Sequence, residues 1–242
     1  MAKLYTTEQL ADLWEDVHEI ENMMGRRAFH ILLRQDKKTW EDCWCRKAPD
    51  PCLGSDRGYY RGYDALEAWF SANEKLTARK AELARLKYPE ELADKTDEEL
   101  FGVGSLNVNS LSTPVIEVAE DRQTAKGLWY CMDHVVDYTA TGRHGTLCWG
   151  RLGVDFIRED GQWKIWHMVF VPDFNARPGT DWTKPLPNEE LDPIFAPLAD
   201  FELPACNVEA GFCAYHGTRP ILTLPQVPKA YRTFDETFSY GV

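Results

Sequence analysis

The stretch from Thr113 to Phe174 constrains the fold of this chain more than any other part. Its extended runs are rich in β-branched and aromatic residues, which favour strands. Turn-forming residues separate the runs at Glu120-Asp121, Thr141–Gly145 and Glu159–Gly161. No helix-period segment interrupts them, so the pattern predicts an antiparallel meander, with a short opening strand at 115–118 and three long strands after it.

The chain before this stretch has helical periodicity. Thr6 and Gln9 have the spacing of a capping box, and apolar residues then recur at helical spacing to about Gln35. A short second helix is expected over Trp40–Arg46. Helices followed by a curved antiparallel sheet predict an α+β architecture, in which the sheet folds around the helices and leaves a conical cavity.

A third helix is predicted after a turn at Gly58–Gly62, and Tyr88-Pro89 ends it. Thr96 and Glu99 have the spacing of a second capping box, which predicts one further helical turn.

The composition changes after Phe174. Nine of the 14 prolines lie beyond it, from Pro178 to Pro228, yet this segment keeps many aromatic residues. Disordered tails are poor in aromatics. We therefore expect residues 1–174 to form an α+β barrel domain. Residues 175–242 are expected to form an ordered, mostly non-regular arm that packs on the barrel or on a neighbouring subunit.

The overall charge excludes several classes of partner. A net charge of −12 argues against nucleic acid, which needs a basic surface, and against anionic membranes. The chain starts with a polar helix and has no run long enough to span a membrane, which predicts a cytoplasmic protein.

The seven cysteines suit reduced thiols better than a disulfide framework. Cys43, Cys45 and Cys52 form the one cluster, and their spacing, with no histidine nearby, is a poor match to zinc. Buried thiols are the preferred interpretation, and no metal site is predicted.

Four segments resemble a known superfamily in the right order along the chain. They are Asp36–Trp40, Gly58–Leu66, Thr113–Val118 with Thr124–Trp129, and Phe156–Ile165. Over residues 8–174 the chain is similar to the nuclear transport factor 2-like superfamily, in the branch of scytalone dehydratase, ketosteroid isomerase and the polyketide cyclases.

This resemblance implies a cone-shaped α+β barrel with one deep apolar pocket. Enzymes of the branch use no cofactor and work by general acid/base chemistry, and relatives are commonly dimers or trimers. Other members, such as the small subunits of ring-hydroxylating dioxygenases, are not catalytic, so the fold alone does not establish activity.

Two residues are the main candidates for proton transfer. The resemblance aligns Asp36 with a pocket aspartate at the end of the first helix, where burial would raise its pKa. The alternative is that Asp36 caps the Lys37–Trp40 turn in solvent. His167 follows Ile165 by two residues on a strand, so we expect it to share a face with Trp163 and Ile165. If that face lines the cone, His167 is the best proton shuttle in the chain. If it does not, His167 is a surface or interface residue.

Two further residues are assigned to catalysis. Asn109 stands where relatives carry a histidine, and it could hold a substrate oxygen or orient a water but cannot shuttle protons. Tyr60, next to Tyr59 at the expected barrel mouth, could donate to a substrate oxygen. Packing by the two aromatic rings is the alternative.

Five residues are assigned to substrate binding: Tyr59, His134, Trp129, Trp149 and His30. His30 lies beside Ile31, where relatives carry a tyrosine, and it could be a core or a pocket residue. His134 and Trp129 lie on opposite faces of one strand, and the sequence leaves open which face is concave. The abundance of tryptophan suggests an aromatic ligand, although a tryptophan-rich core explains it equally well.

These features together predict a cofactor-independent lyase or isomerase that acts on a hydrophobic, aromatic or polycyclic, oxygenated small molecule. The lyase reaction would be a dehydration or a C–C cleavage that releases a small aldehyde. The alternative is a non-catalytic ligand-binding or scaffold subunit. A homo-oligomer, trimer or dimer, is expected in either case. An enzyme should bring Asp36 and His167 together at a closed cavity, whereas a scaffold should hold them apart.

Overall fold

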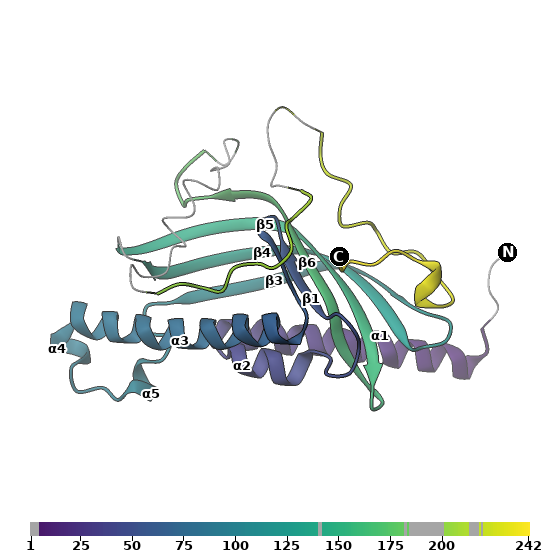
Figure 1. The fold of residues 1–242 in the computed structure, drawn as a ribbon, viewed down its shortest axis with the longest axis horizontal. Coiled ribbons are helices and arrows are strands. Elements are labelled where there is room, and N and C mark those ends of the chain that lie inside the picture. Colours follow the sequence, from purple (N-terminus) through teal and green to yellow (C-terminus); the bar gives the residue numbers. More distant parts are fainter. Residues whose placement is uncertain (1–4, 140–141, 182, 184–200, 213–217, 219) are drawn as a thin grey trace.

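The structure is a computed structural model that describes residues 5–139, 142–181, 183, 201–212, 218 and 220–242. A layer of helices lies against one face of a strongly curved six-stranded sheet (Figure 1). The helical elements are α1 (Thr7–Leu32), α2 (Asp36–Lys38), the π-helical turn η1 (Thr39–Cys43), α3 (Tyr63–Lys87), α4 (Pro89–Leu92), α5 (Asp97–Leu100) and the 3-10 turn η2 (Phe234–Glu236). The α+β prediction is confirmed.

The sheet has the strand order β2-β1-β6-β5-β4-β3. Its strands are β1 (Cys52–Ser55), β2 (Gly58–Arg61), β3 (Leu106–Val118), β4 (Thr124–Thr139), β5 (Gly142–Glu159) and β6 (Gln162–Ala176). β3 to β6 form an antiparallel meander, and the short β1 extends the sheet by pairing parallel to β6.

The predicted meander is confirmed, but its first strand is longer than the sequence pattern indicated. β3 begins at Leu106 and passes through an irregularity between Ser112 and Val115, where Thr113 adopts a positive φ of 46°. Because that break interrupts the alternation of side chains, the sequence pattern indicates a strand only after it. The Gly58–Gly62 turn is likewise a strand for most of its length, since residues 58–61 pair with β1.

Both predicted capping boxes are present. The Thr6 and Gln9 side chains each bond the other residue's backbone N–H at the start of α1, and Thr96 and Glu99 do the same before α5. The helix predicted over Trp40–Arg46 is instead displaced towards the N-terminus, as α2 followed by η1.

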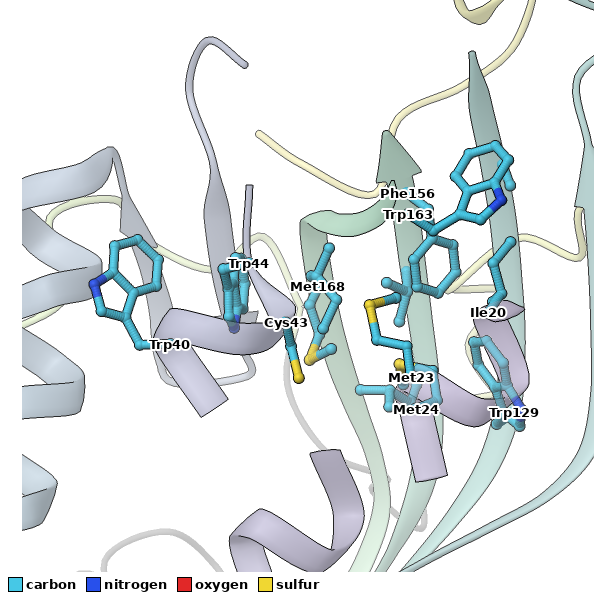
Figure 2. Close-up of a cluster of buried hydrophobic side chains, with 14 of the residues drawn as sticks. Ile20, Met23, Met24, Trp40, Cys43, Trp44, Trp129, Phe156, Trp163 and Met168 are labelled. Atoms are coloured by element: carbon cyan, nitrogen blue, oxygen red, sulfur yellow. The ribbon is translucent and has the colours of Figure 1, made fainter. Parts of the chain in front are cut away.

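The inner core lies between the helices and the concave face of the sheet (Figure 2). Rings from η1 and α3 stack there, with the centroids of Trp40 and Phe70 5.6 Å apart. The labelled core residues are Ile20, Met23, Met24, Trp40, Cys43, Trp44, Trp129, Phe156, Trp163 and Met168.

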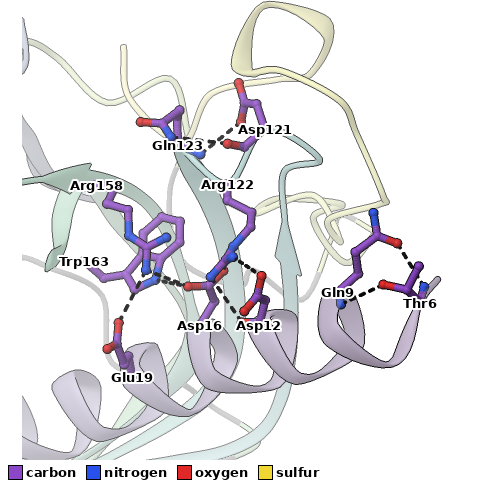
Figure 3. Close-up of polar contacts among 10 residues, drawn as sticks. All are labelled: Thr6, Gln9, Asp12, Asp16, Glu19, Asp121, Arg122, Gln123, Arg158 and Trp163. Atoms are coloured by element: carbon purple, nitrogen blue, oxygen red, sulfur yellow. Dashed lines mark hydrogen bonds and ion pairs between the residues drawn. The ribbon is translucent and has the colours of Figure 1, made fainter. Parts of the chain in front are cut away.

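A buried carboxylate joins α1 to the ends of the strands (Figure 3). The Asp16 side chain is fully buried and accepts from Arg122 Nε at 2.6 Å, from Arg158 at 2.8 Å and from Trp163 Nε1 at 3.2 Å. Asp12, one helical turn earlier, accepts from Arg122 at 2.6 Å. These bonds fix the start of α1 against both hairpin ends.

Much of the described C-terminal segment packs on the outer, convex face of the sheet. An outer cluster contains Cys52, Tyr59, Val169, Val171 and Tyr240, with Val208, Phe212 and Phe238 packed against it. The boundary between a barrel domain and an arm at residue 174 stays a prediction, and β6 continues to Ala176.

A buried ion pair anchors the end of this segment. Lys126 Nζ lies 2.6 Å from Asp155 Oδ1, and both side chains are fully buried. The rings of Phe234 and Phe238 lie 4.5 Å from the ammonium group, and that of Tyr240 lies 5.2 Å away. Such cation–π contacts strengthen when water is excluded.

No helix in the described part of the chain is long and apolar enough to cross a membrane.

Candidate functional site

A cavity of about 250 Å³ lies between the helices, the β1–β2 hairpin and the concave face of the sheet. Its wall is mostly apolar by area, and α1, β3 and β4 each contribute a polar side chain to it. The lining residues are Arg27, Leu53, Gly54, Ser55, Arg57, Gly58, Tyr60, Trp69, Asn109, Cys131, Asp133, Leu152, Phe170 and Cys206.

Four of these residues form a hydrogen-bonded polar network. Asn109 and Asp133 are register partners on β3 and β4, so their side chains lie side by side on the same face. The Asn109 amide nitrogen donates to Asp133, and its oxygen accepts from Arg27 at 3.2 Å. Cys131, two residues before Asp133 on β4, donates its thiol to the same carboxyl over 3.4 Å.

Burial dominates the electrostatics of this network. Desolvation raises the pKa of Asp133, while the hydrogen bonds from Asn109 and Cys131 and the charge of Arg27 oppose the rise. Desolvation also raises the pKa of the Cys131 thiol and lowers the pKa of Arg27. Asp133 is therefore a carboxyl at the cavity wall whose pKa is raised, the direction of shift that favours a general acid or base.

An aromatic pair forms the opposite wall. The rings of Tyr60 on β2 and Trp69 on α3 stack with centroids 4.6 Å apart. The Tyr60 hydroxyl donates to the backbone oxygen of Pro204 at 2.8 Å. Since a phenol has one proton to donate, this bond directs it away from the cavity. Tyr60 can then only accept a hydrogen bond from a ligand, which differs from the donor role that the sequence suggested.

His167 lies on the other face of the sheet, so the prediction that it shares a face with Trp163 and Ile165 is wrong. Asp155 pairs with His167, but the next residue of β5, Phe156, pairs with Ile165. β6 therefore has one extra residue at this point, and such a bulge shifts the alternation of side chains.

The hydrogen bonds around His167 give it a structural role. Its Nδ1 lies 2.9 Å from Asp155 Oδ2, and the Ser239 hydroxyl lies 3.2 Å from both atoms. The backbone N–H of Tyr240 donates to the same carboxyl oxygen at 2.8 Å. His167 thus fastens the C-terminal segment to the convex face, away from the cavity.

Asp36 is not part of the cavity wall either. It begins α2 and is half-buried, and burial raises its pKa while Arg34 lowers it and Glu74 raises it further. The structure therefore does not bring Asp36 and His167 together. His30, near the end of α1, places its Nδ1 3.1 Å from the Gln35 amide oxygen rather than in the cavity.

The other proposed ligand-binding residues also lie outside the cavity wall. Tyr59 is buried in the outer cluster, and Trp129 is buried in the inner core against Phe156. His134 is exposed, because β4 turns Trp129 and Asp133 inward and His134 outward. Trp149 is 43% exposed beside Phe174. Tyr60 and Asn109 do line the cavity, and their roles stay predictions.

The three clustered cysteines are separated in space. Cys43 belongs to the inner core and Cys52 to the outer cluster, while the Cys45 thiol lies 3.9 Å from the Tyr63 hydroxyl. Burial raises the pKa of Cys45 to about 12 and that of Cys52 to about 11, so both stay protonated thiols. Among the residues that the structure describes, no group of three or more histidine, cysteine, aspartate or glutamate side chains is arranged to hold a metal ion.

Sequence reasoning missed Asp133, Arg27 and Cys206 as cavity residues. Two of them carried a usable signal: Asp133 follows Trp129 by four residues on β4 and therefore shares its face, and Arg27 lies on the helical stripe of Met24 and other core residues. Cys206 carried none, because it comes from a segment with no regular pattern.

Comparison with known proteins gives one family match and a set of related folds. The family model described as the SnoaL-like domain matches residues 13–169. No curated protein gives a significant sequence match.

Three solved structures are examples of what the chain is similar to. A putative scytalone dehydratase from Novosphingobium aromaticivorans is 14% identical, with 72% of this chain and 95% of that chain covered and a TM-score of 0.47. The Kfla4162 protein from Kribbella flavida is 11% identical, covering 68% and 95%, with a TM-score of 0.49. The hexachlorocyclohexane dehydrochlorinase LinA-type3 from Novosphingobium barchaimii is 12% identical, covering 72% and 99%, with a TM-score of 0.46.

Proposed function

Because this chain belongs to the SnoaL-like family, whose members bind small molecules, we propose that it is a cofactor-independent lyase or isomerase with Asp133 as its proton-transfer group. The observation that carries the proposal is the desolvated Asp133 carboxyl in a mostly apolar cavity, hydrogen-bonded by Asn109 and Cys131. Dehydration, double-bond isomerisation and C–C cleavage that releases a small aldehyde all need such a group.

The other polar groups of the cavity have separate roles in this proposal. Arg27 is the partner of a developing oxyanion, because a guanidinium carries five N–H donors and this one lies at the cavity wall. Asn109 is a positioning residue, since both ends of its amide are used by Arg27 and Asp133. Tyr60 accepts a hydrogen bond from a substrate hydroxyl. Asp133 thus has the proton-transfer role in this proposal that the sequence assigned to Asp36 and His167.

The cavity limits the size of the substrate. Its volume of about 250 Å³ lies below the range of roughly 300–1,000 Å³ that is common for pockets that hold drug-sized ligands. The aromatic walls of Trp69, Tyr60 and Phe170 suit a flat ring. An oxygenated compound of one or two rings therefore fits better than the polycycle that the sequence also allowed.

The experiment is a screen of the purified protein against hydroxylated one- and two-ring aromatic compounds, followed by absorbance with no cofactor added. For a compound that is turned over, Asp133→Asn should lower kcat by roughly 10²–10⁴-fold, the usual contribution of a general acid or base. Asp36→Asn is the matched comparison, because it removes another half-buried carboxyl whose pKa is also raised. Loss of turnover in Asp36→Asn with retention in Asp133→Asn would reverse the assignment.

A second candidate is a ligand-binding or scaffold subunit, which the separation of Asp36 and His167 favours. Calorimetry on the same compounds distinguishes an enzyme from a ligand-binding subunit. Compounds that bind with micromolar affinity but are recovered unchanged, with equal affinity for wild type and Asp133→Asn, support the binding subunit. Self-association as a dimer or trimer stays a prediction, and light scattering tests it. A cytoplasmic location also stays a prediction.

A further inference from the structure

The cavity wall contains a residue from far outside the matched domain. The SnoaL-like match ends at residue 169, yet Cys206 lines the cavity together with Tyr60 and Gly58 of β2. Cys206 is half-buried, so its side chain is neither part of the core nor fully exposed to solvent.

Residues 204–208 lie alongside β2 and form backbone hydrogen bonds with it, in the manner of an additional strand. The backbone N–H of Tyr59 donates to the Val208 oxygen at 2.8 Å, and the N–H groups of Asn207 and Val208 donate to the Tyr59 oxygen at 3.0 and 3.2 Å. Asn207 also forms two bonds with the Arg61 backbone, each 2.9 Å long. The bond from the Tyr60 hydroxyl to the Pro204 oxygen adds a side-chain contact between β2 and the segment.

The fit of this segment depends on a residue without a side chain. Gly58 has φ 130°, and a Cβ atom added there would lie 2.7 Å from the Cys206 Cβ and 2.8 Å from the Val208 oxygen. Both distances are well inside van der Waals contact, so β2 and the segment approach each other closely because residue 58 is glycine.

We propose that residues 204–208 form the specificity-determining wall of the cavity and that Cys206 sets the size of the ligand it admits. The inference rests on the proposed function in one respect, because it takes the cavity to be a small-molecule site. It adds that substrate choice is controlled by the chain beyond the SnoaL-like domain.

The test measures binding of phenol, 2-naphthol and 4-phenylphenol by calorimetry. Cys206→Phe should weaken 4-phenylphenol binding roughly tenfold or more relative to phenol, whereas Cys206→Ala should shift the preference towards the larger compound, since small changes in an apolar pocket discriminate ligands by about 10–200-fold. Ala205→Phe is the matched control, because it adds the same bulk to an exposed position of the same segment.

A second pair of variants tests the seating of the segment. Gly58→Ala should expose Cys206, so that its reaction with N-ethylmaleimide, followed by peptide mass spectrometry, becomes at least several-fold faster. Gly62→Ala is the control, since Gly62 also has a positive φ, 90°, but an added Cβ would meet nothing within 4 Å.

The outcomes separate the two proposals. If wild type binds none of the phenols, the small-molecule site fails and this inference fails with it. If wild type binds them but Cys206→Phe, Cys206→Ala and Ala205→Phe keep the wild-type ratios of affinity for the three phenols, only the inference is overturned. Circular dichroism on each variant confirms that a lost affinity does not come from unfolding.

Discussion

Asn109 and Asp133 face each other across the β3–β4 ladder, and the Asn109 amide donates to the Asp133 carboxyl. The pairing keeps a carboxyl at the cavity wall in one orientation. It also favours the charged form of a carboxyl whose pKa burial raises. The acid/base behaviour of the cavity therefore depends on the balance between these two effects.

Asp133 should reduce the stability of the protein at neutral pH. Its folded pKa is raised above the unfolded value, so its ionisation destabilises the folded state, and the stability present at low pH is lost as pH rises through the folded pKa. Asp133→Asn cannot ionise. We expect this variant to be more stable than wild type at pH 7, with the difference vanishing below about pH 3.9, the ordinary pKa of aspartate. Urea unfolding across this range measures it, and a difference that grows towards low pH contradicts the sign.

Asn109 should hold the pKa of Asp133 down. Asn109→Leu removes the amide that stabilises the carboxylate, so the pKa of Asp133 should rise further. A carboxyl ¹³C NMR titration measures the change directly, and the corresponding limb of the pH–rate profile should move the same way. Ser110→Ala, one residue along β3, is the control. An unchanged or lowered pKa in Asn109→Leu would show that the amide does not act on Asp133.

Asp16 should contribute far more to stability than its neighbour Asp12. Asp16→Asn leaves Arg122 and Arg158 without their buried counter-charge, and breaking a buried pair costs about 3–5 kcal/mol. Both arginines keep some exposure, 29% and 21%, which favours the lower end of that range. Asp12 is 44% exposed, so Asp12→Asn should cost only about 0.2–1 kcal/mol. Chemical unfolding of both variants makes the comparison, and equal losses would count against it.

The buried Lys126–Asp155 pair should respond asymmetrically to substitution. Asp155→Asn leaves the ammonium group without a counter-charge among aromatic rings, at a cost of about 3–5 kcal/mol. Lys126→Met places an apolar side chain among the same rings, while Asp155 keeps its bonds to His167, Ser239 and Tyr240. We therefore expect the smaller loss in Lys126→Met. Thermal unfolding should rank the two variants, and the reverse order would mean that the carboxylate depends on the lysine more than the lysine depends on it.

Local signals in the sequence predicted much of the fold. The two capping boxes, the first helix, the start of α3 and the strands of the meander all depend on residues close together in the chain. The resemblance to the nuclear transport factor 2-like superfamily is likewise confirmed by the family match.

The candidate site was harder to predict, because its residues are positioned by contacts between distant segments. His167 changes face at a bulge that arises where β5 and β6 pair, and the β6 sequence alone carries no sign of it. The alternation of side chains along β4 placed Asp133 and Trp129 on the same face, but only the packing of the helices shows that this face is concave. The aromatic wall was predicted in part through Tyr60, whereas its hydrogen bond to Pro204 depends on a segment without periodicity.

That bond joins residues 144 positions apart in the chain. β1 and its parallel neighbour β6 are separated in the chain by α3 and by β3, β4 and β5, the first three strands of the meander. Contacts of such long sequence separation form late, since the entropy of closing the intervening chain is lost before they stabilise anything. We therefore expect the cavity to be among the last parts of the molecule to be completed during folding. A ribosome-bound chain that already contains the full sheet still lacks one wall of this cavity.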